Sequence, residues 1–365
     1  MIRLKVTISF WVIIGYSLAV FTILLVISCG KNDTSVSQNI YTTPVTKKPT
    51  DTTTKTPGAT GGNNPNPSPV GNYNASAPIN YRHRNNLTIS GLSIDALGAS
   101  TTLIMLSNCA NVHITNCRLL NTASFAIYLL NCTNVTIDQN FISNAGFGVY
   151  VQYGQTAKIN NNQILNINGI DTQSLGHAVQ FDNVNGGGNQ INNNQIENLA
   201  GAALHPHDIL NVHQSNGLPG DSIQVIGNWI RGGQTSLWPT TQSAAAGIVL
   251  GDNGGSYQVC RNNIVVNGGR IGIQAQGGNH IMIDHNQIYG ISMPITLVGL
   301  AWGNWSGLPS SDVTYAYNWV KWYNFDGSEV DHFESNQFGD VVLIGNQWRA
   351  NINAGILPST IITLK

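Results

Sequence analysis

Acidic and imidazole side chains gather in one stretch of the chain, residues 177–252. This stretch holds four of the nine histidines and five of the fifteen carboxylates that follow residue 78. Carboxyl groups and imidazoles are the usual general acids and bases of enzymes, and a guanidinium supplies a fixed cation. We therefore expect acid–base chemistry from six residues in this stretch: Asp182, Asp208, Asp252, His207, His213 and Arg231.

A repeated six-residue motif predicts how these side chains are positioned. It reads apolar, two polar residues, Asn, one variable residue, apolar, and its copies begin 22 to 34 residues apart. A period in this range is typical of a solenoid, and the alternation of apolar and polar residues favours strands. The ten copies are Ile89–Ile94, Ile114–Leu119, Ile137–Ile142, Ile159–Ile164, Ile191–Ile196, Val225–Ile230, Val259–Ile264, Ile283–Ile288, Tyr315–Val320 and Leu343–Trp348.

The fourth position of the motif is asparagine in eight consecutive copies. If each copy is one coil of a parallel β-helix, these side chains stack about 4.8 Å apart. Stacked amides form a hydrogen-bonded ladder, and asparagine tolerates the left-handed backbone of a tight bend. We interpret the eight as structural: Asn140, Asn162, Asn194, Asn228, Asn262, Asn286, Asn318 and Asn346.

From residue 86 to about 350 this pattern resembles the right-handed parallel β-helix proteins of the pectate-lyase type. The resemblance implies an all-β fold, a right-handed parallel β-helix of about ten coils, in a protein that acts on or binds polysaccharide. The motifs Arg-x-Pro-x-x-Arg, Asn-Thr-Asp and Asp-Asp of such enzymes are missing, and Gly176-His177-Ala178 only approaches their Gly-His-Gly. A non-catalytic glycan-binding protein and a structural surface protein therefore stay open as alternatives.

The second strand of each coil is expected to present polar side chains outward, because strand residues alternate between two faces. The motif starts at 159, 191, 225 and 259 lie 32, 34 and 34 residues apart, so long loops should wall this surface into a cleft over coils four to six. Amides and phenols suit sugar hydroxyls, and rings suit the apolar faces of sugars. The expected substrate-binding residues are Tyr128, Tyr150, Gln152, His177, Gln180, Asn211, Trp238, Gln274 and Gln276.

Two mechanisms fit these residues. Hydrolysis needs two carboxyl groups, and Asp182 and Asp252 should lie two coils or about 10 Å apart, with Asp208 in the coil between them. Elimination from a uronate needs a base and a cation, which His207, His213 or Arg231 could supply, while the three aspartates could hold Ca²⁺. The residue types alone do not separate a lyase from a hydrolase.

The N-terminus resembles a bacterial lipoprotein signal peptide over residues 1–29. Arg3 and Lys5 precede an apolar run that ends at Cys29, the expected site of lipidation. An uncleaved transmembrane anchor and a plain cleaved signal peptide are the alternatives. All three place the remaining chain outside the cytoplasm.

The composition limits the kinds of partner that the chain can bind. Only 9% of the residues are charged, and no cluster of Lys and Arg could neutralise a phosphate backbone, so we expect no nucleic acid partner. Residues 30–78, rich in Thr, Pro and Asn, are expected to be a disordered linker. Residues 79–365 should form one β-helix domain with a tryptophan-rich C-terminal cap. A monomer attached to the membrane by its lipid anchor is the expected state.

Two cysteines should stack in adjacent coils. Cys109 and Cys132 precede a Val-x-Ile sequence by the same distance. Their Cα atoms, about 4.8 Å apart in that arrangement, could carry a disulfide. Free thiols packed in the core are the alternative.

Overall fold

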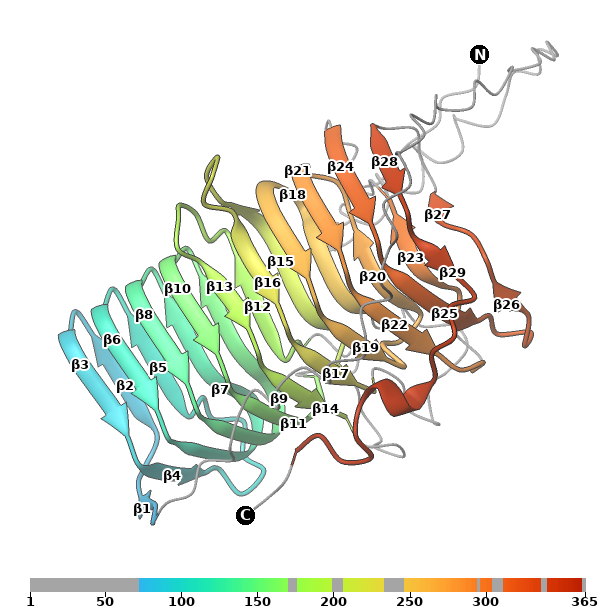
Figure 1. The fold of residues 1–365 in the computed structure, drawn as a ribbon. Coiled ribbons are helices and arrows are strands. Elements are labelled where there is room, and N and C mark those ends of the chain that lie inside the picture. The colour runs from blue at the N-terminus through green and yellow to red at the C-terminus, as the bar shows by residue number, and fades with distance from the viewer. Residues whose placement is uncertain are drawn as a thin grey trace, which may run out of the picture. The chain divides into compact units, whose positions relative to one another are not determined.

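The strands of the chain wind into a right-handed parallel β-helix (Figure 1), which confirms the predicted fold. The chain divides into two units, Met1–Thr56 and Pro57–Lys365, and every described residue belongs to the second. The computed structural model describes residues 72–169, 176–198, 206–232, 246–293, 296–303, 311–335 and 340–362.

The predicted signal peptide, its Cys29 and the linker up to residue 71 lie outside the described residues. Within the described ranges, no helix has the length and the apolar character that crossing a bilayer requires.

Each coil contributes strands to three faces, on which successive coils pair in parallel. Strands β7 (Arg118–Leu130) and β9 (Phe141–Gln152) turn a corner and belong to faces 2 and 3, and β18 (Ala246–Arg261) belongs to faces 3 and 1. Face 1 further contains β3 (Asn85–Ser90), β6 (Ala110–Thr115), β8 (Thr133–Asp138), β10 (Gln155–Asn160), β13 (Gln190–Asn192), β16 (Ile223–Ile226), β21 (Asn279–Asp284), β24 (Ser311–Ala316) and β28 (Val341–Ile344).

The two other faces are built in the same way. Face 2 further contains β1 (Asn74–Ala75), β4 (Leu92–Asp95), β11 (Gln163–Ile167), β14 (Gln195–Glu197), β17 (Trp229–Arg231), β19 (Ile264–Val266), β22 (Gln287–Gly290), β25 (Trp319–Tyr323) and β29 (Gln347–Trp348). Face 3 further contains β2 (Ile79–Arg82), β5 (Ile104–Ser107), β12 (Val179–Asp182), β15 (Asp208–Asn216), β20 (Ile271–Ala275), β23 (Val298–Trp302) and β27 (Glu334–Ser335). Outside this pattern lie β26 (Glu329–Val330), which is antiparallel to β25, and the 3₁₀ turn η1 (Ala354–Ile356).

Aliphatic side chains fill the interior because each strand alternates inward apolar and outward polar residues. On face 1, Ile114, Ile137, Ile159 and Ile191 stand in register in successive coils and are fully buried. Among the described residues, face 1 has ten strands, one for each predicted copy of the motif. The pattern of apolar residues therefore fixes which side chains can face outward.

The asparagine ladder is present, with one member different from the prediction. Asn228 Nδ2 donates to Asn263 Oδ1 at 2.9 Å, and Asn263 Nδ2 donates to Asn286 Oδ1 at 3.0 Å. Asn262 is therefore not in the ladder. In this coil Cys260, and not Val259, pairs with Val225 and points inward, so the motif is shifted by one residue.

The left-handed residue of the bend precedes the ladder asparagine. Gln139, Asn161 and Asn262 have φ angles of 53°, 56° and 55° and stand directly before ladder members. The sequence predicts this conformation at the ladder position itself, and the structure moves it one residue earlier. The ladder asparagines are selected for their buried hydrogen bonds and not for a positive φ.

The four cysteines within the described residues are free and buried. Cys132 packs beside Cys109 without a disulfide, and burial raises the pKa of its thiol to about 11. Cys117 replaces a ladder asparagine, and its backbone N–H donates to Asn140 Oδ1 at 2.9 Å. These thiols act as core side chains.

Tryptophans fill the core of the last coils. Trp302 and Trp322 are buried, so neither ring is available to a sugar. A Cβ at Gly290 would lie 2.4 Å from Trp322, so only glycine leaves room for this ring. Trp305, another residue of the predicted cap, lies outside the described residues.

The C-terminal segment covers part of face 2 (Figure 1). Its Leu357, Ile361 and Ile362 form one buried apolar cluster with Trp229 and other outward residues of that face. Arg231 holds the segment, because its guanidinium donates to the carbonyl oxygens of residues 358 and 359.

Candidate functional site

Outward side chains of face 3 form rows along the helix axis because its strands pair in register. The middle row consists of Tyr128, Tyr150, Gln180, Asn211, Val249 and Gln274. The end row, next to face 1, consists of Leu130, Gln152, Asp182, His213 and Asp252. Most of the predicted catalytic and binding residues that the structure describes thus share face 3, and its two outward rows carry those of β9, β12, β15 and β18.

Asp182 is the acceptor at the centre of one hydrogen-bond network. Its Oδ2 accepts from the Tyr150 hydroxyl and from Gln152 Nε2, the latter at 3.0 Å. Its Oδ1 accepts from His213 Nδ1 at 2.8 Å and from Asn183 Nδ2 at 2.8 Å. Asp182 and His213 therefore form a fixed carboxylate–imidazole pair.

The hydrogen bonds of this network set the protonation of its members. Burial raises the pKa of Asp182, but the hydrogen bonds from His213, Tyr150 and Gln152 outweigh it and bring the pKa to about 2. The hydrogen bond to Asp182 raises the pKa of His213 above its usual value. Burial and the bond to Asp182 raise the pKa of Tyr150, which remains a neutral donor. The pair thus favours a carboxylate next to an imidazolium.

A second network joins Asp208 and Asp252 through one amide. Asn211 Nδ2 donates to Asp208 Oδ2 at 3.0 Å and to Asp252 Oδ2 at 2.9 Å, so these two oxygens lie at most about 6 Å apart. His207 Nδ1 lies 3.2 Å from Asp208 Oδ2, and the Ala246 N–H donates to Asp208 Oδ1 at 3.2 Å. Asp208 lies in the coil between those of Asp182 and Asp252, and its role of closing the gap between the carboxyl groups stays a prediction.

The two carboxyls of the second network differ in acidity. Burial raises the pKa of both, but hydrogen bonds from His207 and Asn211 together with nearby imidazoles bring that of Asp208 below its usual value. For Asp252, burial and repulsion by Asp208 outweigh the one hydrogen bond that it accepts among the described residues, from Asn211, so its pKa stays raised. Two neighbouring carboxyl groups whose pKa values are pushed apart are the usual arrangement of an acid and its ionised partner.

An irregularity in strand pairing brings Asp252 into this site. Asn211 pairs with Val249, but His213 pairs with Asp252, so two residues of β18 stand opposite one residue of β15. Gly251 at this bulge has a φ of 57°, which glycine adopts without strain. Strict alternation predicts Gly251 as the outward residue and Asp252 beyond the strand, whereas the bulge places Asp252 beside His213.

Aromatic rings adjoin the acidic networks on the side of the earlier coils. The ring centroids of Phe125, Tyr128, Phe147 and Tyr150 lie 5.1 to 5.5 Å from their neighbours in this group. The sequence predicts only the two tyrosines, because a phenylalanine in a strand reads as core. Strict alternation would also place Phe125 and Phe147 inward, because each stands two residues before an inward β-branched residue.

Histidines continue the aromatic group toward the acids. The His177 ring lies 5.3 Å from Phe147 and 6.0 Å from His207, edge to face in both cases. Burial lowers the pKa of His177 to about 4, whereas the hydrogen bond to Asp208 raises that of His207. His177 is therefore neutral at neutral pH, whereas His207 holds its proton more readily than a free imidazole.

The remaining predicted residues are placed less closely together. Gln180 Nε2 lies 3.4 Å from Asn211 Oδ1, Gln274 is buried in the middle row, and Gln276 follows β20. Arg231 is not brought to the site, because it lies on face 2 and pairs with Glu197 at 2.9 Å. The sequence predicts Arg231 as a catalytic residue because it precedes an insertion, but the strand register places it on another face than the other candidates.

Trp238 lies outside the described residues, as do most residues of the insertions 168–176, 201–207 and 232–246 that the sequence predicts to wall a cleft. The fourth predicted insertion, 214–221, is described: it contains the end of β15 and a turn in which Leu218 and Asp221 are hydrogen-bonded.

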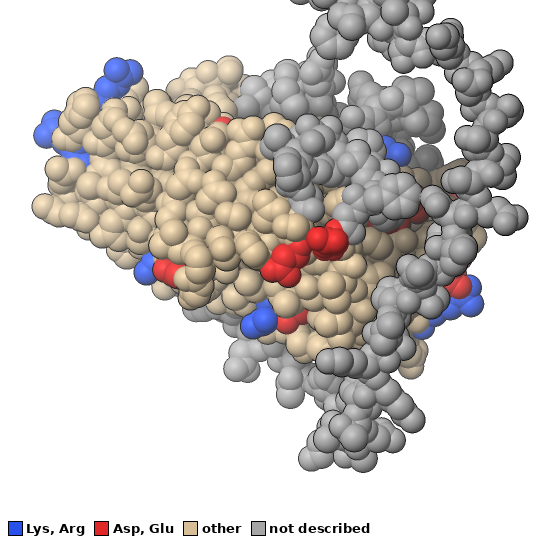
Figure 2. Space-filling view, turned by 90° about the horizontal axis from the view of Figure 1, so that it is seen from above, with Lys and Arg blue, Asp and Glu red and all other residues tan. Residues whose placement is uncertain are grey.

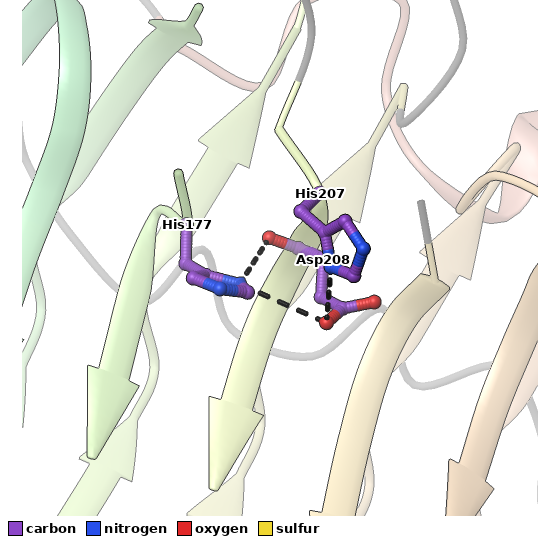
Figure 3. Close-up of side chains that lie close together, drawn as sticks. All are labelled: His177, His207 and Asp208. Atoms are coloured by element: carbon purple, nitrogen blue, oxygen red, sulfur yellow. Dashed lines mark hydrogen bonds and ion pairs between the residues drawn. The ribbon is translucent and has the colours of Figure 1, made fainter. Parts of the chain in front are cut away.

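Potential metal ligands converge at one edge of the site (Figure 3). Among the described residues, His177, His207 and Asp208 form the one group of three whose ligand atoms all lie within 4.8 Å of one another. The three aspartates expected to hold Ca²⁺ do not converge in this way, because His213 separates Asp182 from Asp252 in the end row.

The surface around the helix carries little charge. Figure 2 shows mostly uncharged atoms, with acidic groups gathered near the middle of the view and Lys and Arg scattered. Among the described residues, no Lys or Arg is hydrogen-bonded to the two networks of face 3. The positive charge available to this site therefore comes from its histidines.

One protein-family model agrees with the architecture. Residues 77–248 match the family model described as right handed beta helix region. No curated protein matches the chain.

Among solved structures, the chain is similar to a hyperthermoactive exopolygalacturonase from Thermotoga maritima, with 11% identity, 75% of this chain and 83% of that chain covered, and a TM-score of 0.48. It is similar to an alginate lyase from Paenibacillus sp., with 13% identity, 72% and 95% coverage and a TM-score of 0.41. The catalytic domain of a GH87 alpha-1,3-glucanase gives 11% identity, 75% and 58% coverage and a TM-score of 0.29. These likenesses concern the fold alone.

Proposed function

We propose that this β-helix binds a polysaccharide along face 3 and hydrolyses a glycosidic bond at Asp208 and Asp252. One observation carries the proposal: a single amide, that of Asn211, holds two carboxyl groups whose pKa values are shifted in opposite directions. Glycoside hydrolysis needs this combination, a protonated carboxyl for the leaving oxygen and an ionised carboxyl opposite it.

The opposite pKa shifts support an assignment of the two roles. Asp252, with its raised pKa, is the proton donor, and Asp208, kept ionised by its hydrogen bonds, is the nucleophile or the base for water. Their nearest bonded oxygens lie at most about 6 Å apart, which is close to the about 5–5.5 Å between the carboxyl groups of retaining enzymes. The Asp182–Asp252 pair, two coils or about 10 Å apart, exceeds the separation in retaining enzymes and lies at the edge of the about 6.5–9.5 Å of inverting ones.

The surrounding groups would orient the substrate. His213 stands between Asp182 and Asp252 in the end row, and its imidazolium stabilises negative charge on either side. The rings of Phe125, Tyr128, Phe147 and Tyr150 offer a stacking surface for the apolar faces of sugars. A glycan lying along the axis would therefore meet aromatic rings first and carboxyls next.

A uronate-containing chain is the proposed substrate class, since the imidazoles of His207 and His213 have raised pKa values and can pair with its carboxylates. A protein held outside the cytoplasm by a lipid on Cys29 would meet such polymers. The lyase alternative would use the same imidazoles and leave an unsaturated uronate.

Incubation with pectins, alginates, glycosaminoglycans and neutral glucans tests the proposal. We expect new reducing ends without the absorbance of an unsaturated uronate. Asp252→Asn and Asp208→Asn should each lower the rate by about 10²–10⁴-fold. Asp138→Asn is the matched control, because Asp138 also bonds a histidine, His113, at 2.9 Å but lies on face 1.

Each contrary outcome has its own meaning. Unchanged turnover in Asp252→Asn would overturn the assignment of the acid, and an unsaturated product would replace hydrolysis by elimination. Affinity without any product would make the protein a glycan-binding module. No affinity for any glycan would leave a structural surface protein.

A further inference from the structure

We propose that His177, His207 and Asp208 form a binding site for a divalent transition metal ion of the Zn²⁺ type. The three residues come from adjacent coils of face 3, where Asp208 opens β15 and His177 precedes β12 (Figure 3). Their ligand atoms lie within 4.8 Å of one another. His207 Nδ1 is 3.2 Å and His177 Nδ1 is 3.9 Å from Asp208 Oδ2.

The donor set selects the class of metal. Imidazole nitrogens with one carboxylate suit zinc, iron, nickel and copper, whereas Ca²⁺ and Mg²⁺ require oxygen ligands. Three protein ligands leave at least one position of a tetrahedral ion open, as in catalytic zinc sites. The site is therefore distinct in chemistry from the all-aspartate calcium site that the sequence suggested.

The groups behind the ligands hold them in place. Asp208 Oδ1 accepts the Ala246 N–H, and Oδ2 accepts Asn211 Nδ2. Ligating carboxylates are usually fixed by such hydrogen bonds. The His177 side chain is buried against the edge of Phe147, and the backbone N–H of His207 donates to the carbonyl of residue 176 at 2.8 Å. The backbones of all three ligands are thus set by strand pairing.

Binding needs only a small closure of the group. Zn–N bonds of 2.0–2.1 Å place tetrahedral donors about 3.3 Å apart, and the His207–Asp208 separation of 3.2 Å already meets this. His177 Nδ1 must exchange its contact with the Asp208 carbonyl, 3.0 Å away, for the metal. His207, whose side chain is 35% exposed, has room to rotate toward it.

The ion would sit beside the proposed hydrolytic site. Asp208 belongs to both, and Asn211 links it to Asp252. The existence of the metal site does not depend on the proposed function, but its use does: a cation at this position would bind a carboxylate of a uronate chain. It would also offset the repulsion between such a chain and the aspartates.

Titration calorimetry with Zn²⁺ on the chelator-treated full chain tests the site. We expect one ion per chain at this site. The affinity should fall at least about 10-fold in His207→Ala, since even the loss of a group that hydrogen-bonds to a metal ligand costs about 10–100-fold. His113→Ala is the matched control. His113 also bonds an aspartate, Asp138, but among the described residues it belongs to no group of three potential metal ligands. Ca²⁺ should not compete.

A spectroscopic readout separates loss of a ligand from loss of the fold. Co²⁺ bound to the wild type should give the visible absorption bands of a low-coordinate site with nitrogen and oxygen ligands. The variants His177→Gln and His207→Ala should lose these bands but keep the circular dichroism spectrum of the β-helix. Equal Zn²⁺ affinity in the wild type and His207→Ala would overturn the proposal. Asp252→Asn should keep Zn²⁺ binding while it loses turnover, so failure of the metal site and failure of the hydrolytic site give different results.

Discussion

Replacing Asn194 with alanine should destabilise the protein far more than the same change at Asn192, two residues earlier. Asn194 Nδ2 donates to Asn228 Oδ1 at 3.0 Å and to the Ile159 carbonyl at 2.8 Å. Its Oδ1 accepts from the backbone N–H of Asn162 at 3.0 Å and from Asn162 Nδ2 at 3.1 Å. The side chain is fully buried, so water cannot replace these four hydrogen bonds.

The magnitude follows from these contacts. A net value of about 0.5–1.5 kcal/mol for each hydrogen bond gives a loss of about 2–6 kcal/mol in the free energy of unfolding. The upper part of this range is expected because the backbone N–H of Asn162 would remain buried without an acceptor. Loss of one ladder member also interrupts a chain of polarised amides.

Asn192→Ala is the matched control. Asn192 also accepts from a backbone N–H, that of Ile226 at 2.9 Å, and donates to Gln224 Oε1 at 3.1 Å. It is half-buried and faces outward, so water can take over both bonds. We expect a loss of about 0.5 kcal/mol or less, as for most surface substitutions.

Urea denaturation followed by circular dichroism and by tryptophan fluorescence measures both variants. A difference between Asn194→Ala and Asn192→Ala of less than about 1 kcal/mol would refute the view that the buried ladder stabilises the coils.

Three further predictions concern the site and the C-terminal segment. The pKa of His213 is raised by its pairing with Asp182, so this pairing stabilises the fold fully below pH about 6.5. The contribution is lost as the pH rises through the raised pKa of His213. The melting temperatures of wild type and His213→Gln should therefore differ more at pH 5.5 than at pH 9. Tyr150→Phe removes a hydrogen bond from Asp182, so the pKa of that carboxyl should rise from about 2, as NMR titration would show; an unchanged value would contradict the network. Leu357→Ala should lower the free energy of unfolding by about 2 kcal/mol, because Leu357 is buried against face 2, and an unchanged melting temperature would show that the segment is not held there.

The sequence predicts the architecture well because a parallel β-helix repeats one set of constraints in every coil. The inward residues Ile137 and Ile159 and the ladder members Asn140 and Asn162 all follow from the motif. The error at Asn262 arises where the pattern is ambiguous. Residues 259 and 260 are both apolar, so either could begin the motif, and only the register with neighbouring coils selects Cys260.

The site is less predictable because its geometry depends on departures from the repeat. Alternation places Tyr150 and Asp182 outward, and the structure agrees. The bulge that carries Asp252 to His213 leaves only a weak trace in the sequence, a glycine before the acid. Arg231 is an example of a wrong prediction. The sequence predicts it at the site because it precedes an insertion, but closeness to an insertion does not determine which face a strand joins, and its strand β17 lies on face 2.

The order of charges along the end row explains how three carboxyls can share one face. Two ionised aspartates in adjacent coils, about 4.8 Å apart, would repel each other by about 3 kcal/mol at an effective dielectric constant of 20. In the structure His213 stands between Asp182 and Asp252, and Asn211 lies between Asp208 and Asp252 as a shared donor. Each acid is therefore next to a donor or a cation, but for Asp252 burial and the nearby Asp208 outweigh Asn211 and His213 and keep its pKa raised. Among the three aspartates of face 3, Asp252 therefore keeps its proton most readily, because its pKa is raised. A general acid requires this property.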